Sequence, residues 1–160
     1  MFLLLLFFNT VSLMNFGQSS KVIRTQEENM LWFQSTKHIS LNKQIEAIKE
    51  RLLSDTAVYF TNSSSDRLFI TETPKNKIKT EVRPIIIVNN YLININNATK
   101  ANQIENFNSL LKESSISSIQ IFIPNEIAAQ ALYGSDAANG IIIISMPNKK
   151  AFNKIKKINF

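Results

Sequence analysis

Two uninterrupted runs of apolar residues constrain the fold of this chain more than any other feature. Residues 84–88 read Pro-Ile-Ile-Ile-Val, and residues 141–144 are four isoleucines in a row. A strand with one face in water alternates apolar and polar side chains, whereas these runs contain no polar position. The runs therefore predict buried strands, and we expect Gly140 to open the second as a central strand of the sheet.

Helical patterns surround these runs. A helix is predicted at 41–53, after Ser40 as its N-cap, because its apolar residues are spaced four, three and four positions apart. From residue 84 onward we expect a hairpin turned by Asn89-Asn90, a helix at 100–113, a strand at 116–123, a short helix capped by Asn125, and the final strand. This order predicts an α+β fold, a small mixed β-sheet with packed helices.

The segment before the first run is predicted to hold a helix and a β-hairpin. The apolar cluster around Trp32 indicates a short helix or a strap that packs the indole onto the body. Residues 57–62 and 67–73 are rich in β-branched and aromatic types, which favours a hairpin. The polar stretch 74–82 is the best candidate for an internal boundary. We therefore divide the mature chain into an N-terminal region at 21–82, a second unit at 83–147 and a basic tail at 148–160.

The first 20 residues have no charged side chain and are typical of a secretory signal peptide. Their apolar stretch is broken by polar residues and falls short of the roughly 20 residues that cross a bilayer. Small residues between Gly17 and Ser20 are suitable for cleavage. We expect export, with an uncleaved anchor or a misassigned start codon as alternatives. Because the chain has no cysteine, its folding does not depend on an oxidant.

The net charge of +6 comes almost entirely from the C-terminal tail, which leaves 13 basic and 12 acidic residues in positions 1–148. A nucleic-acid binding domain needs a basic face on its folded body, so nucleic acid is not an expected partner. The tail is interpreted either as a frayed terminus or as a weak helix that contacts an anionic membrane surface. The lysines that would make such a contact are Lys149, Lys150, Lys154, Lys156 and Lys157.

No pattern in the sequence indicates catalysis, a cofactor or a metal. The chain has one histidine, His38, in a polar setting, and three glycines, too few for a phosphate-binding loop. Glu126 and Asp136 flank the predicted short helix, but a helix N-terminal acid and a turn residue explain them better than a catalytic pair does. We expect no enzyme, no cofactor-binding residue and no metal site.

The most informative stretch is 116–145, which holds two of the three glycines. It combines an Ile-x-x-Ile-x-Ile strand, a helix of small residues, a Tyr-Gly-Ser-Asp-Ala-Ala-Asn-Gly turn and an isoleucine strand. These motifs resemble the end of the plug domain of TonB-dependent outer-membrane receptors of the Bacteroidetes type, and the hairpin at 84–93 is weakly similar to an earlier part of that domain. The motif residues are Tyr133, Gly134, Ser135, Asn139 and Gly140.

The resemblance covers 84–147 and includes departures. Asp136-Ala137 stands where the family has Arg-Gly, Asn89-Asn90 stands where it has Asp-Gly, and no β-barrel sequence follows Pro147. The resemblance implies an envelope protein in the periplasm or at the periplasmic face of the outer membrane. Its partner would be an envelope protein or a receptor component. The expected role is a non-catalytic binding or accessory module, with an orphan plug fragment of a transporter as the alternative.

The motif residues themselves have a structural interpretation. We expect the alanines to let the short helix lie close to the sheet, the glycines to supply positive φ angles, and the Tyr133 ring to pack with its hydroxyl in water.

Overall fold

The computed structural model describes residues 22–23, 25–60, 78–80 and 82–160, so the predicted signal peptide lies outside the described part of the chain. Its helices are α1 (Gln26–Lys37), α2 (Leu41–Asp55), α3 (Ala101–Leu110), α4 (Ile127–Tyr133) and α5 (Lys149–Ile155). Its strands are β1 (Val58–Phe60), β2 (Ile78–Thr80), β3 (Ile85–Val88), β4 (Tyr91–Ile93), β5 (Ser118–Phe122) and β6 (Ile141–Ser145). Two 3₁₀ helices are η2 (Glu113–Ser115) and η3 (Gly134–Asn139). The predicted α+β class is confirmed.

The main sheet has the strand order β4-β3-β6-β5, and the two apolar runs form its two central strands. Strands β3 and β6 are parallel, while β4 and β5 pair antiparallel to them at the two edges. The predicted hairpin is confirmed, because Asn89 and Asn90 join β3 to β4 with φ angles of 47° and 64°. Positive φ at both central residues is the mark of the tight turn that matches strand twist.

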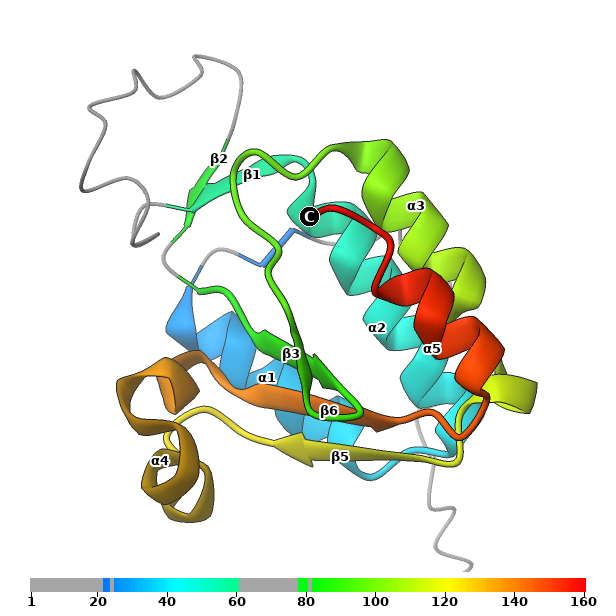
Figure 1. Ribbon diagram of the computed structural model, residues 1–160. Helices are drawn as coiled ribbons and strands as arrows, with labels where there is room; N and C mark the ends of the chain where they lie inside the picture. The colour runs from blue at the N-terminus through cyan, green and yellow to red at the C-terminus, as the bar shows by residue number, and fades with distance from the viewer. Residues whose placement is uncertain (1–21, 24, 61–77, 81) are drawn as a thin grey trace, which may run out of the picture.

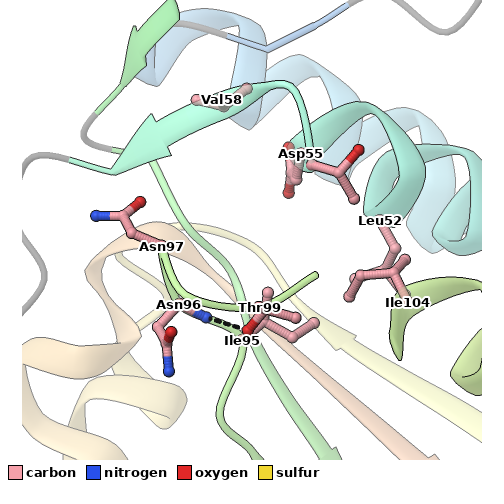
Figure 2. Close-up of a pocket in the computed structure, with 9 residues that line it drawn as sticks. Leu52, Asp55, Val58, Ile95, Asn96, Asn97, Thr99 and Ile104 are labelled. Carbon is pink, nitrogen blue, oxygen red and sulfur yellow. Dashed lines mark hydrogen bonds between the residues drawn. The ribbon is translucent and has the colours of Figure 1, made fainter. Parts of the chain in front are cut away.

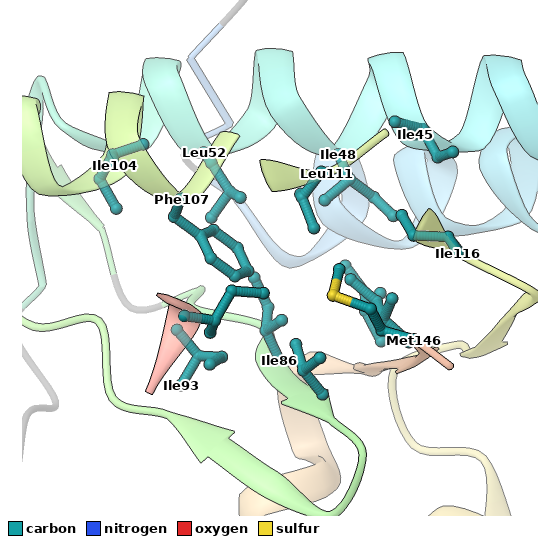
Figure 3. Close-up of a cluster of buried hydrophobic side chains, with 14 of the residues drawn as sticks. Ile45, Ile48, Leu52, Ile86, Ile93, Ile104, Phe107, Leu111, Ile116 and Met146 are labelled. Carbon is teal, nitrogen blue, oxygen red and sulfur yellow. The ribbon is translucent and has the colours of Figure 1, made fainter. Parts of the chain in front are cut away.

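The larger core lies between one face of this sheet and four helices (Figures 1 and 3). Ile86 and Val88 of β3, with Ile142 and Ile144 of β6, project into it. The helices contribute Phe33, Ile45, Ile48, Leu52, Ile104, Phe107 and Ile155. The predicted helix at 41–53 is confirmed as α2, whose apolar face lies over the sheet in Figure 3. Residues from both sides of position 82 thus share a single core.

The opposite face of the sheet has a much smaller cover. Ile87 of β3 and Ile141 of β6 pack there against Ala129 of α4 and Ala137 of η3. Figure 1 shows α4 at the lower left, at the end of the sheet where β6 begins. Leu92 of the edge strand β4 remains 56% exposed. Both apolar runs are therefore buried on two faces, as predicted, although one layer is only a short cap.

The helix predicted around Trp32 is present as α1, with a capping box at Thr25 and Glu28, and Trp32 packs against the larger core as expected, although only Phe33 is completely buried. One local expectation needs correction. Asn125 does not cap the short helix, since its φ is 63° and α4 begins after Glu126. The predicted N-cap at Asn125 is wrong because asparagine is common both at helix N-caps and at turn positions with positive φ, and it adopts the second of these here.

The segment between α2 and β3 also differs from the expected loop. Strand β1 pairs in parallel with β2, which lies inside the stretch assigned to a linker at 74–82. The second strand of the predicted hairpin, 67–73, lies outside the described residues. The linker is predicted because residues 74–77 are polar. Strand β2 has only three residues, which is too short for an alternation of apolar and polar side chains to be recognised.

The basic tail does not fray. It forms α5, whose Ile155 is fully buried and whose Ala151 and Phe152 pack against the larger core. The apolar side of this helix, which was a candidate for contact with a membrane surface, thus packs inside the protein. The five lysines of the tail are exposed. Of the two interpretations of the tail, the helix is thus the one present, and its lysines can extend into water from a packed backbone.

Candidate functional site

The five motif residues lie together in and beside the cap formed by α4 and η3. Tyr133 ends α4 and is half-buried against the smaller core, as expected. Ser135 is exposed. Gly134 and Gly140 stand at the two ends of η3 with φ angles of 61° and 89°. The positive φ expected at Gly134 is present, although its ψ of −143° is not that of a left-handed helical residue.

The two glycines meet different surroundings. A Cβ atom on Gly134 would have no other atom within 4 Å, apart from its own chain neighbours. A Cβ atom on Gly140 would fall 2.6 Å and 2.8 Å from two Cε atoms of the Phe33 ring. Position 140 therefore requires glycine for two reasons: its positive φ angle disfavours a side chain, and the Phe33 ring occupies the space where a Cβ atom would lie.

Helix α1 holds the end of η3 through two further side chains. The Asn29 amide donates to the carbonyl oxygen of Asn139 at 2.9 Å, and the Gln26 amide donates to the Asn139 side chain at 2.8 Å. Asn29 is completely buried. The motif is thus clamped by a helix more than 100 positions earlier in the chain, which sequence spacing alone could not indicate.

Behind Asn29 lies a buried ionic network centred on Arg51 of α2. Its Nε donates to both carboxylate oxygens of Asp55 at 2.9 Å, and one terminal nitrogen donates to the Asn29 oxygen at 3.0 Å. The other terminal nitrogen donates to the Val82 carbonyl at 3.2 Å, and the guanidinium lies 5.5 Å from the centre of the Trp32 ring. Arg51 therefore connects α2, α1 and the segment that enters β3.

Burial raises the pKa of Asp55 to about 6, although the charge and the hydrogen bond of Arg51 act in the opposite direction and lower it.

Asp55 also borders a small cavity with Leu52 and Ile104 on one side and Asn96 and Thr99 on the other (Figure 2). The cavity measures about 10 Å³, which suffices for about one water molecule. It is too small for an organic substrate.

The raised pKa of Asp55 predicts an unusual pH dependence of stability. Between about pH 4 and pH 6 the unfolded chain releases this proton while the folded chain keeps it, so the free energy of unfolding should fall by about 3 kcal/mol as pH rises. Urea unfolding at pH 4, 5, 6 and 7 measures this loss. Asp55→Asn is the control, and its difference from the wild type isolates Asp55 from other groups. A difference that is constant over this range would refute the prediction.

Glu126, one of the two acids considered for catalysis, is engaged in structure. Its carboxylate accepts from Lys37 and from the backbone of Ile123, both at 3.0 Å. Partial burial raises its pKa, but these hydrogen bonds and the charge of Lys37 outweigh that and lower it. The structure gives no placement for the side chain of Asp136, and His38 is exposed as expected. The described partners of the Glu126 carboxylate are therefore a lysine and a backbone amide.

The outer face of α4 is the most distinctive surface of the cap. The helix Ile-Ala-Ala-Gln-Ala-Leu-Tyr has no charged residue. Ala129 faces the sheet, whereas Ile127 is 84% exposed and Leu132 73% exposed, with Ala128 and Ala131 exposed beside them. We call these four residues the α4 outer face. Soluble proteins rarely leave such neighbouring apolar side chains in water without a partner.

Within the described residues, no helix has the length and hydropathy needed to span a bilayer, and no group of three or more acidic or histidine side chains converges on a metal-sized site. Comparison with models of known protein families, with curated proteins and with solved structures returned no match.

Proposed function

We propose that the chain is an exported, non-catalytic binding module of the bacterial envelope, similar to a receptor plug domain. It works in the periplasm or at the periplasmic face of the outer membrane. The observation that carries the proposal is the α4 outer face, where Ile127 and Leu132 are mostly exposed on a helix without charge. Burying such side chains against a protein partner contributes about 1.5–3 kcal/mol each.

The construction of the cap supports a binding role. Asn139 and Ala137 anchor η3 to α1 and to the sheet, and Ala129 packs α4 on the same smaller core with Ile127 and Leu132 outward. A rigid surface loses little conformational entropy when it binds. The engagement of Glu126 by Lys37 and the small size of the cavity at Asp55 favour binding over catalysis.

The alternative function, an orphan plug fragment of a TonB-dependent transporter, would use the same cap. The glycine motif favours it as a candidate, because this part of the chain carries the resemblance. The two functions differ in the partner: a β-barrel protein for the fragment, and another envelope protein for a free module.

Co-purification from the native envelope fraction tests the proposal. Ile127→Glu combined with Leu132→Glu should abolish recovery of the partner, because charges on the α4 outer face oppose burial. Leu31→Glu combined with Leu53→Glu is the matched control, since these leucines are also exposed but lie on α1 and α2. The control should keep the partner, and both variants should keep the wild-type melting temperature within a few degrees.

The outcomes separate clearly. A β-barrel partner lost only in the α4 variant supports the transporter fragment, and a partner of another kind supports a free module. Equal recovery in all three proteins would exclude the α4 outer face as the binding surface, and hydrolysis in a broad substrate screen would contradict the non-catalytic role.

A further inference from the structure

A second surface feature lies away from α4, between the C-terminal end of α3 and helix α5. Figure 1 shows these two helices side by side at the upper right, while α4 is at the lower left. The hollow between them measures about 190 Å³, which is room for several water molecules. Its polar lining consists of Ser109, Lys112, Ser115, Asn148, Lys150 and Lys154. We call this set the lysine hollow.

The lysine hollow gathers the positive charge of three lysines. Lys112 follows α3, whereas Lys150 and Lys154 are four positions apart on α5 and so project on one side of it. No described lining residue is acidic, and none of the ion pairs among the described residues involves these lysines. Like charges four positions apart on a helix repel each other.

The nearby helix end neutralises only a part of this charge. The C-terminal end of α3 carries roughly half a negative charge from its aligned peptide groups. The three lysines carry three positive charges, so more than two of them remain after this partial negative charge is subtracted. A bound anion would remove the remaining repulsion, so the arrangement favours one with more than one negative oxygen.

Ser115 adds a donor from inside the hollow. Its residue is 7% exposed and lines the hollow, so its hydroxyl can donate to a ligand bound there. Asn148 uses its side-chain oxygen to cap α5 through Ala151, and this leaves its amide nitrogen as a further donor.

From this geometry we propose that the lysine hollow binds a phosphate group. Lys112, Lys150 and Lys154 supply the charge, and the Ser115 hydroxyl and the Asn148 amide supply directional hydrogen bonds. The phosphate can belong to a small soluble anion or to the headgroup of an anionic phospholipid, since both present the same oxygens. The site is independent of the α4 outer face.

The test measures binding to two probes. Inorganic phosphate is titrated into the full chain at constant ionic strength, with chloride as the reference, and amide chemical shifts are followed by NMR. Vesicles of phosphatidylglycerol are compared with vesicles of phosphatidylcholine by flotation. The test variant carries Lys112→Gln, Lys150→Gln and Lys154→Gln. The matched variant carries Lys43→Gln, Lys149→Gln and Lys157→Gln, which removes the same charge from exposed lysines outside the hollow.

We expect saturable shifts at Lys112 and Ser115, and binding about tenfold weaker in the test variant than in the matched variant. Saturation by phosphate alone assigns the site to a soluble anion, and hollow-dependent binding to phosphatidylglycerol vesicles alone assigns it to a lipid headgroup. Equal loss in the two variants would overturn the proposal, because attraction to the overall charge would then explain binding. Absence of binding to both probes would also overturn it.

Discussion

Gly140→Ala should destabilise the protein by about 3–5 kcal/mol, a large part of the 5–15 kcal/mol that is typical of a domain. One cause is the backbone, because φ of 89° with ψ of 157° is a conformation that essentially only glycine adopts, at a cost of about 1–3 kcal/mol for other residues. The other is the Phe33 ring, whose Cε atoms lie 2.6 Å and 2.8 Å from the new methyl group. The ring is fully buried, so it can move away only by displacing neighbouring core side chains.

Gly134→Ala is the matched control for this prediction. Its φ of 61° with ψ of −143° also disfavours a side chain, at a cost of about 1–3 kcal/mol, but a methyl group there meets no atom within 4 Å outside its chain neighbours, so no ring contact adds to that cost. Urea unfolding of both variants gives the comparison. Phe33→Leu combined with Gly140→Ala should cost at least 0.5 kcal/mol less than the sum of the single variants, because the smaller side chain relieves the clash. Equal losses at the two glycines would show that the ring contact has no energetic role.

Arg51→Met should be comparably damaging, with an expected loss of about 3–5 kcal/mol at pH 7.5. The methionine fills much of the same volume, but it leaves the Asp55 carboxylate buried at 7% exposure without its partner. It also removes the donors to Asn29 and Val82. Urea unfolding with tryptophan fluorescence measures the loss, since Trp32 stacks on Arg51.

The pH dependence and a second variant identify the cause. Without Arg51 the pKa of Asp55 should rise further, so the variant should lose less stability at pH 4.5, where the carboxyl stays protonated, than at pH 7.5. Arg51→Met combined with Asp55→Asn removes both charges and should recover part of the loss. A loss that is independent of pH and is not recovered in the double variant would assign the effect to packing alone.

The parts of the fold that could be predicted from the sequence are those fixed by local chemistry. Four consecutive isoleucines have few alternatives to a buried strand, and two asparagines between apolar runs form a tight turn because both tolerate positive φ. The helix at 41–53 was visible because its apolar side chains recur on one side. The small residues at 128–140 predicted a helix lying close to the sheet, and the burial of Ala129 and Ala137 agrees with this, whereas Ala128 and Ala131 are exposed.

The remaining features depend on contacts between distant segments. Arg51 and Asp55 have the spacing of an ordinary exposed ion pair on a helix, and Asn29 is one polar residue among many, so their burial was not predictable. The lysine hollow joins residues from 109–115 with residues from 148–154, and its convergence depends on the docking of α5. Ile127 and Leu132 would be assigned to a core by any hydropathy pattern, yet the structure exposes both.

The parallel pairing of β3 with β6 has a consequence for the order of events during synthesis. Its partners, such as Ile85 and Ile141, are separated by 56 positions, and the Asn89 side chain extends the ladder by bonding both the nitrogen and the carbonyl of Met146. Because β6 pairs with both β3 and β5, neither pairing can form before residues 141–145 have been synthesised. Pairing of segments that are this far apart also slows folding, because the connecting chain loses conformational entropy before the strands gain their hydrogen bonds.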